Sequence, residues 1–200
     1  IIAAVFIVVT GIILLGSKFY FEHKKEIQKR AKESDSALSR VIATYDWEYS
    51  STRKPMAQDY LVKYWEVLIG KWHKPWNREL ESELTRKEKR DIKGLAWAEQ
   101  PKTINEVGST FTIQGFDLNY AGVILGPSVK YRDGKIRFDP SASHNEKAVR
   151  NRTLSDGTKK KFGETLIQHE VRVLMTRGVN GMYIYACDPE LRAALLAAAK

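Results

Sequence analysis

Cysteine is nearly absent from this chain of 200 residues, which contains only Cys187. A single thiol cannot form an internal disulfide, so a disulfide framework is excluded and a reducing compartment, the cytoplasm, is expected. The four histidines, at positions 23, 73, 144 and 169, are scattered and are interpreted as surface or packing residues. Without a Cys/His cluster, nothing in the sequence indicates a structural zinc site or another metal site.

The chain also lacks a working phosphate-binding loop. Residues 11–18 (GIILLGSK) contain two glycines at the spacing of such a loop. However, Ser17-Lys18 reverses the Gly-Lys-Ser/Thr order that places the lysine on the phosphates and the hydroxyl on magnesium. The residues between the glycines are large and apolar, which does not suit a phosphate cradle. No paired Asp/Glu-x-Lys cluster supports a nuclease either, and this chain alone is not expected to hydrolyse ATP.

Positive charge is what the chain does have, with a net charge of +9 and an isoelectric point near 9.5. This balance favours a polyanionic partner, either nucleic acid or an anionic membrane surface. The alternative is a basic surface with no specific partner. The length is sufficient for one good-sized core, or for one core and an appendage.

Residues 1–21 are the most apolar part of the chain. A bilayer-spanning helix needs about 20 apolar residues, and the aromatic residues 19–21 followed by lysines are typical of a membrane interface facing the cytoplasm. We therefore predict a hydrophobic helix, with a membrane anchor as the favoured hypothesis and a buried strand and helix of an α/β domain as the alternative. No basic region precedes the run, which argues against a signal peptide. Residues 22–39 are charged and predict a linker helix.

Residues 40–200 have the pattern of an α/β domain with a mainly parallel sheet. The apolar run 120–125, which ends at a glycine, is typical of a buried parallel strand. A helical stripe predicts a helix over residues 164–175. The other predicted elements are strands at 39–45 and 182–186, a hairpin of 129–131 and 135–138 around Asp133-Gly134, and a helix at 189–199 with Asp188 as its cap.

Two segments, about 50–102 and 139–161, are predicted to be insertions. The first contains four tryptophans, which either offer stacking surfaces to single-stranded nucleic acid or pack the insertion against the sheet, the interpretation we favour. Within it, residues 79–93 predict an exposed helix or a mobile loop. The second insertion is polar and basic, and either contacts a phosphate backbone or is simply solvated.

Two short stretches carry a family resemblance. Residues 112–117 (TIQGFD), leading into a strand, resemble the fifth motif of superfamily-one helicases, and residues 173–178 (VLMTRG) resemble the sixth. Further landmarks follow in order, from residues 40–47 (RVIATYDW) and 75–77 (PWN) to 183–191 (YIYACDPEL). From about residue 27 to residue 196 the chain resembles the C-terminal part of the Schlafen-like (group three) bacterial DNA/RNA helicase domain.

That resemblance implies a RecA-like second lobe of the P-loop NTPase superfamily. ATP and magnesium would lie between this lobe and a first lobe that bears the Walker motifs. Arg177 would be the arginine finger that stabilises charge on the γ-phosphate. Its structural alternative is a helix-terminal arginine that neutralises the last carbonyls. Asp117 stands where many superfamily-one helicases have glutamate, which puts a direct ribose contact in doubt.

The resemblance, together with the basic composition of the second insertion, assigns further residues to each ligand. The expected nucleotide contacts are Gln114, Gly115, Asp117 and Thr176. The expected nucleic-acid contacts are Thr110, Thr112, Lys130, Arg132, Arg150 and Arg152. Through Thr110, Thr112 and Gln114 the nucleotide state would be linked to the nucleic-acid track.

Two functions remain open from the sequence. The first is the second lobe of a helicase-like, ATP-dependent DNA- or RNA-acting protein, which contributes the arginine finger and is inactive alone. The second is a non-enzymatic nucleic-acid-binding or interaction module, tethered to a membrane if residues 1–21 span one. The sequence does not distinguish DNA from RNA.

Overall fold

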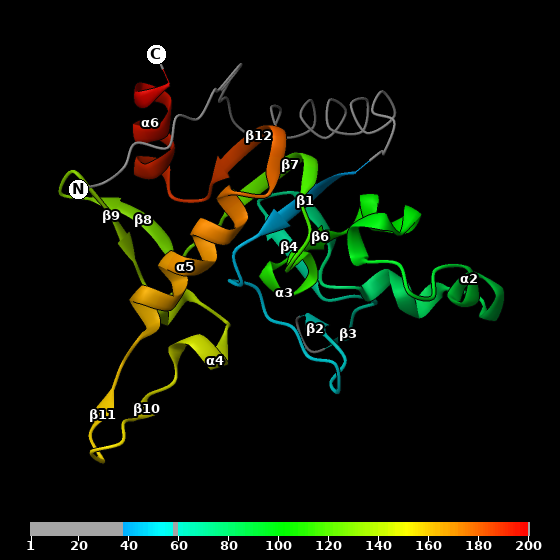
Figure 1. Cartoon of the computed structure of the whole chain (residues 1–200), viewed down its shortest axis with the longest axis horizontal. Helices are drawn as coiled ribbons and strands as arrows, with labels where there is room; N and C mark the ends of the chain where they lie inside the picture. The colour runs from blue at the N-terminus through cyan, green and yellow to red at the C-terminus, as the bar shows by residue number, and fades with distance from the viewer. Residues whose placement is uncertain (1–37, 58–59, 200) are drawn as a thin grey trace.

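A four-stranded sheet forms the centre of the protein. The structure, a computed structural model, describes residues 38–57 and 60–199. The sheet contains β1 (Ser39–Ala43), β6 (Val107–Gly108), β7 (Leu118–Leu125) and β12 (Gly178–Ala186), in the order β12-β7-β1-β6 (Figure 1). Every neighbouring pair is parallel. The predicted α/β class with a mainly parallel sheet is therefore confirmed.

The sheet is buried on both faces, which explains its apolar strands. In β1 and β7, Ile42 pairs with Val123 and these side chains face one core, whereas the next pair, Ala43 and Ile124, faces the other. All four side chains are at most 1% exposed. A strand covered on both sides needs apolar residues at every position rather than at alternate ones, which is the pattern seen in residues 120–125.

Helices cover the first face. They are α3 (Thr110–Ile113), α5 (Gly163–Met175) and α6 (Pro189–Ala198). The apolar stripe of α5 buries Ile167 and Leu174, as the helical periodicity predicted. Helix α6 begins where the sequence placed it, because the Asp188 side chain accepts a hydrogen bond from the Leu191 amide at 2.9 Å.

The first insertion packs against the sheet, as the favoured interpretation of its tryptophans predicted. Trp76 lies in the core of the second face and Trp97 in that of the first, and both are at most 1% exposed. Neither indole can therefore stack on a base. The elements of this insertion are β2 (Met56–Ala57), β3 (Tyr60–Leu61), β4 (Glu66–Ile69), β5 (Trp72–Pro75), η1 (Glu79–Glu83), α2 (Arg86–Asp91) and η2 (Trp97–Glu99), and η3 (Pro101–Asn105) begins at its end.

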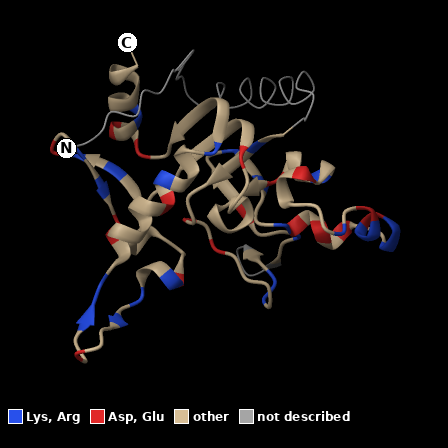
Figure 2. Ribbon diagram, in the orientation of Figure 1, with Lys and Arg blue, Asp and Glu red and all other residues tan. Residues whose placement is uncertain are grey.

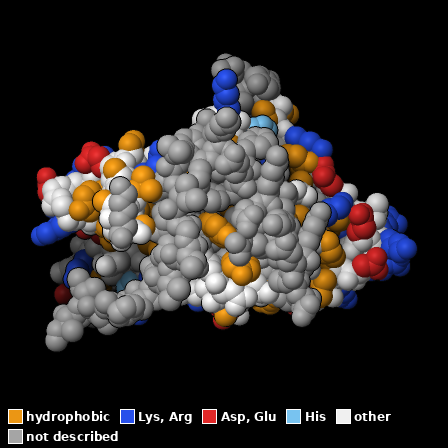
Figure 3. Space-filling view, turned by 90° about the horizontal axis from the view of Figure 1, so that it is seen from above, with side chains coloured by type: hydrophobic (Ala, Val, Ile, Leu, Met, Phe, Trp, Pro, Cys, Tyr) orange, Lys and Arg blue, Asp and Glu red, His pale blue; other side chains and the backbone are white. Residues whose placement is uncertain are grey.

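The segment predicted as an exposed helix or loop forms η1 and α2, which contain no buried residue. Helix α2 carries charges of both signs, and these gather at the right-hand end of the molecule (Figures 2 and 3). The helix exists without burial because Thr85 and Glu88 form a capping box at its start.

The predicted hairpin is present as β8 (Val129–Arg132) and β9 (Lys135–Phe138). Its turn residues Asp133 and Gly134 have φ angles of 52° and 72°, as a type I′ turn requires. The second insertion follows with η4 (Pro140–Ala142), α4 (Glu146–Val149), β10 (Arg152–Thr153) and β11 (Lys159–Lys160). Its first half packs on the domain through buried Ala148, whereas residues 150–161 are all exposed.

The predicted hydrophobic helix at 1–21 and nearly all of the linker helix at 22–39 lie outside the described residues. Strand β1 starts at Ser39, one residue before the predicted beginning of the domain. Within residues 38–57 and 60–199, no helix is both long enough and apolar enough to cross a bilayer. The membrane anchor stays a prediction.

Candidate functional site

Two adjoining hollows lie beyond the carboxyl ends of β1 and β6. The larger has a volume of about 790 Å³ and the smaller about 300 Å³, and both are lined by Phe111, Asn145 and Lys147. We name them together the carboxyl-edge groove. Its aromatic and basic lining residues are Tyr45, Tyr49, Arg53, Arg78, Phe111, Lys147 and Arg152. The carboxyl edge of a parallel sheet is where α/β proteins usually bind ligands.

An exposed aromatic ring stands in this groove. Phe111 is 53% exposed although it is a large apolar residue. Its ring meets that of Tyr45 edge-on, with centroids 5.4 Å apart, and Tyr45 in turn lies 5.4 Å from the buried ring of Trp76. Phe111 is thus an exposed ring held by two rings behind it, the arrangement of a stacking platform.

The turn that presents Phe111 is built by its neighbours. Ser109 caps α3 by accepting a hydrogen bond from the Phe111 amide at 3.3 Å, and the Thr112 hydroxyl accepts one from the Ser109 amide at 2.8 Å. Gly108 precedes this turn because a Cβ there would lie 2.6 Å from the Trp97 ring. Residues 110–113, just before and within the stretch that resembles the fifth helicase motif, therefore form a short, capped helix.

The groove has more cations than carboxylates. Arg53, Arg78, Lys147 and Arg152 line it, against Glu146 and Glu170. Burial raises the pKa of Glu170 to about 7, so this side chain is partly neutral at neutral pH. The lining is accordingly suited to an anionic ligand with flat groups.

Glu170 also joins three elements beneath the groove. Its Oε1 accepts hydrogen bonds from the Tyr45 amide at 2.9 Å and the Thr110 hydroxyl at 3.4 Å. Its buried Oε2 has no hydrogen-bond partner in the described part of the chain. An unpaired oxygen in a buried site is a second reason for the proton to stay on this carboxyl.

Asp46 fastens the carboxyl ends of β1 and β7 to each other. Its Oδ2 accepts hydrogen bonds from the Thr44 hydroxyl at 3.0 Å and the Ser128 amide at 2.8 Å. A Cβ on Gly126 would lie 2.4 Å from that oxygen, so only glycine fits here. Burial raises the pKa of Asp46.

Four of the five residues assigned to the nucleotide lie at the opposite edge of the sheet, where β7 and β12 begin. The Arg177 guanidinium donates to the carbonyls of Val173 at 3.0 Å and Phe116 at 3.3 Å, and its Nη1 lies 3.1 Å from Asp117 Oδ1. The two helicase-like segments are thus brought into direct contact. We name Gly115, Asp117, Thr176 and Arg177 the amino-edge cluster, whereas Gln114, also assigned to the nucleotide, lines the smaller hollow of the carboxyl-edge groove.

Arg177 has here the contacts that its structural alternative expects. Its side chain is 20% exposed and neutralises the carbonyl end of α5, while the Thr176 hydroxyl donates to the carbonyls of Arg172 and Val173. Gly115 has a φ of 75°, and a Cβ added to it would meet no atom within 4 Å, so local backbone geometry accounts for this glycine.

Segment 110–117 connects the two edges. Thr110, Thr112 and Gln114 line the carboxyl-edge groove. Asp117, three residues after Gln114, contacts Arg177 at the amino edge. A single turn of backbone therefore passes from one candidate site to the other, as the predicted link between nucleotide and nucleic acid would require.

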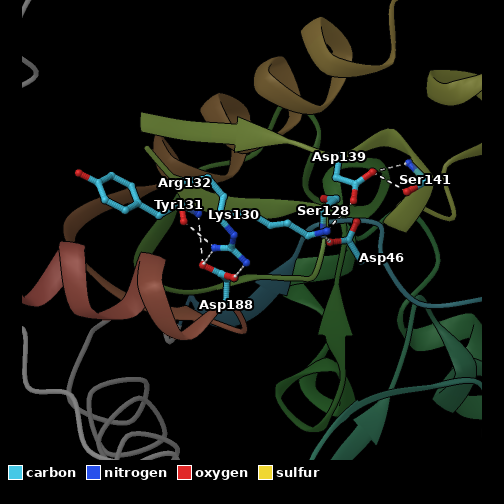
Figure 4. Close-up of polar contacts among 8 residues, drawn as sticks. All are labelled: Asp46, Ser128, Lys130, Tyr131, Arg132, Asp139, Ser141 and Asp188. Atoms are coloured by element: carbon cyan, nitrogen blue, oxygen red, sulfur yellow. Dashed lines mark hydrogen bonds and ion pairs between the residues drawn. The ribbon is translucent and has the colours of Figure 1, made fainter. Parts of the chain in front are cut away.

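The remaining predicted nucleic-acid contacts separate into two groups. Lys130 and Arg132 line neither hollow and are paired with carboxylates on neighbouring elements (Figure 4). Lys130 bonds Asp139 at 2.5 Å, and Arg132 bonds both oxygens of Asp188, at 3.0 and 2.8 Å.

These bonds lower the pKa of both acids to about 2, because each carboxylate accepts a hydrogen bond from a cation. The pairs hold the β8–β9 hairpin to η4 and α6. By contrast, Arg150, at the end of α4, and Arg152, the first residue of β10, are exposed, and Arg152 lines the groove.

Magnesium finds no ready ligand set in the described residues, where no group of three or more His, Cys, Asp or Glu side chains converges. The amino-edge cluster offers one guanidinium and one carboxylate. It therefore fits a contribution to an anion site but not the whole of a metal–nucleotide site.

The sequence missed the most distinctive residues of the groove. From the sequence, no role in a site was assigned to Phe111, Tyr45, Arg53, Arg78 or Lys147. One signal was available, because Phe111 is a large apolar residue between two threonines. Only the structure shows that α3 is four residues long and buries Ile113 but not Phe111.

Comparison with known proteins identifies relatives of the chain. The profile of the family described as "Schlafen group 3, DNA/RNA helicase domain" matches residues 21–188. A protein of Saccharomyces cerevisiae that is described as uncharacterized is 36% identical over 178 residues. That alignment covers 86% of this chain but 34% of the yeast protein, so the chain spans about a third of that relative's length. No solved structure matches.

Proposed function

Because the chain belongs to the Schlafen group 3 DNA/RNA helicase domain family, we propose that it is the RecA-like second lobe of a helicase-like protein and binds a single strand of nucleic acid in the carboxyl-edge groove. The four-stranded parallel sheet is compatible with such a lobe. The observation that carries the proposal is the exposed Phe111 ring, backed by Tyr45 and Trp76 and surrounded by cations.

A single strand suits this lining better than a duplex does. Its bases are free to stack on an aromatic side chain, an interaction worth about 1–3 kcal/mol per base. Arg78 and Lys147 line the groove with the ring and would contact successive phosphates, whereas Arg53, which also lines it, lies 2.9 Å from Glu48 and would have to exchange that partner. Stacking and phosphate contact do not depend on base identity, so binding is expected to be tolerant of sequence.

The nucleotide belongs to the amino-edge cluster in this proposal. Arg177 would stabilise charge on the γ-phosphate of an ATP held with magnesium mainly by a first lobe, elsewhere in the intact protein or on another chain. The 200 residues contain no phosphate-binding loop of their own. To reach the phosphate, the guanidinium would exchange its contacts with Val173 and Phe116 for the ligand.

The groove is tested by binding of a fluorescent oligonucleotide of about 16 nucleotides to the 200-residue chain over a salt series. Phe111→Ala is expected to weaken binding about 5- to 150-fold, which corresponds to the loss of one stacked base. The matched control is Ile136→Ala, which removes another half-exposed apolar side chain (51%) outside the groove. Equal affinities for these two variants, or no salt-sensitive binding by the unsubstituted chain, would overturn the proposal.

A non-enzymatic binding module is the second candidate, and the engagement of Arg177 by carbonyls of its own chain favours it. ATP hydrolysis with a first lobe added as a separate polypeptide separates the two. Turnover that Arg177→Ala abolishes, and that Asp117→Asn does not, supports the helicase-like lobe. Nucleic-acid binding that ignores both nucleotide and Arg177 supports the module.

A further inference from the structure

A basic hairpin projects from the domain beside the groove. It comprises residues 150–161, which we name the basic arm, and all twelve are exposed. Both of its strands, β10 and β11, extend away from the sheet (Figure 1) and carry positive charge up to an acidic turn (Figure 2). Its charged residues are Arg150, Arg152, Asp156, Lys159, Lys160 and Lys161.

The arm is ordered by its own turn. Arg152 pairs with Lys160 and Thr153 with Lys159 across the two strands. At the tip, the Leu154 amide donates to the Thr158 carbonyl at 2.8 Å, and Asp156 Oδ1 accepts hydrogen bonds from the amide and hydroxyl of Thr158 at 2.9 and 2.7 Å. The one carboxylate of the arm is therefore engaged in shaping the turn.

Core packing does not explain this hairpin. An isolated two-stranded ribbon is marginally stable in water, and placing lysine and arginine opposite each other adds like-charge repulsion. No carboxylate in the described part of the chain forms an ion pair with its five cations. A polyanion between or against the strands would relieve that repulsion, which points to an anionic ligand.

The arm continues the groove. Arg152, on β10, lines the smaller hollow, and its Nη2 donates to the carbonyl of Lys147, which lines both hollows, at 3.2 Å. A strand that leaves the groove at this end passes directly to the base of the arm. The ligand of the arm is then the next part of the same nucleic acid.

We propose that the basic arm lies in the major groove of duplex DNA that adjoins the bound single strand, so that the ligand of this lobe is a junction between single-stranded and duplex DNA. The inference rests on the proposed function of the carboxyl-edge groove. Two paired strands lie about 4.8 Å apart, and with their side chains they match the roughly 12 Å width of the major groove of B-form DNA. The major groove of an A-form RNA helix is too narrow and deep for this fit.

The experiment compares three labelled ligands with the 200-residue chain: a DNA single strand, the same strand ending in a duplex of about one helical turn, and the all-RNA form of that junction. The arm variant is Lys159→Gln, Lys160→Gln and Lys161→Gln together, three exposed positions, of which Lys160 places its Nζ 5.4 Å from the centroid of the Phe162 ring. The matched control replaces three other exposed lysines, Lys87, Lys89 and Lys93, on and after α2 at the opposite end of the molecule (Figure 2).

The unsubstituted chain is expected to bind the DNA junction about tenfold more tightly than the strand, because several phosphate contacts are added. The arm variant should lose this advantage and lower the salt slope for the junction by about 2–3. Its binding to the strand alone should stay the same, and the control variant should match the unsubstituted chain on all three ligands.

Three results would overturn the inference while leaving the groove intact: strand binding without a junction advantage, equal weakening of strand and junction by the arm variant, or equal preference for the RNA junction. Binding of the arm to vesicles of phosphatidylserine and phosphatidylcholine, without a junction effect, would assign it to a membrane surface instead. If the unsubstituted chain does not bind the strand at all, the proposed function fails first.

Discussion

The two edges of the sheet use their charged residues in opposite ways. At the amino edge, Arg177 is enclosed by carbonyls and paired with Asp117, and its side chain is 20% exposed. At the carboxyl edge, Lys147 and Arg152 line an open groove and lie in no ion pair of the described residues. A cation that is already paired contributes to the fold, whereas an unpaired one beside an aromatic ring is available to a ligand.

The largest expected effect is on stability, and it distinguishes the exposed ring of Phe111 from the buried ring of Trp76 behind it. Trp76→Ala removes a fully buried indole and is expected to lower the free energy of unfolding by about 3–5 kcal/mol, whereas Phe111→Ala should leave it nearly unchanged because that ring is half exposed. Urea unfolding followed by circular dichroism measures both. If Phe111→Ala destabilises the protein as much as Trp76→Ala does, Phe111 belongs to the core rather than to the site.

The buried carboxyl beneath the groove predicts a pH dependence. The pKa of Glu170 is raised to about 7 from an ordinary value of 4.5, so the folded state holds the proton more tightly than the unfolded state. The stability it contributes is then full below pH 4.5 and is lost as the pH rises to about 7, a change of up to about 3 kcal/mol.

The free energy of unfolding is measured at pH 5 and at pH 8. Glu170→Gln should remove the part of the difference between these two values that the titration of Glu170 contributes. Asp46, whose pKa is also raised, contributes in the same direction and remains in the variant. An unchanged pH dependence in Glu170→Gln would show that this carboxyl is charged in the folded protein.

At the amino edge, Arg177→Ala should lower the free energy of unfolding by about 1.5–3 kcal/mol, because it removes hydrogen bonds from a charged donor to half-buried carbonyls. Asp117→Asn should cost less than about 1 kcal/mol, since Asp117 is 63% exposed and its ion pair is accordingly weak. Thermal unfolding of the two variants provides the comparison. A negligible effect of Arg177→Ala would mean that the guanidinium is free for the nucleotide without any change at the helix end.

The smallest effect concerns single surface charges in nucleic-acid binding. Lys147→Gln should lower the salt slope by about 1, the value of one phosphate contact, and Lys130→Gln should leave it unchanged. Lys130 was predicted from the sequence as a nucleic-acid contact, but it is bonded to Asp139. If the salt slope falls equally in both variants, the claim that unpaired cations bind the nucleic acid and paired ones do not is wrong.

Local patterns were enough to predict most of the elements around the groove. The hairpin turn at Asp133-Gly134, the stripe of α5 and the cap at Asp188 each depend on residues a few positions apart, and each lies where it was expected. The apolar run 120–125 predicted β7, which extends two residues further towards the amino end. The boundary moved because pairing with β1 and β12, rather than the local pattern, determines where the strand starts.

The sequence by itself determined the family, the α/β class and the excess of positive charge. Tertiary structure alone decided which cations are paired, because the partners are distant in the chain: Arg132 meets Asp188 across 56 residues and Arg177 meets the Phe116 carbonyl across 61. It also decided that Trp76 is buried and Phe111 exposed. Composition gives the numbers of charged and aromatic residues. Only the tertiary structure brings particular ones into contact, and the free energy of folding depends on those contacts.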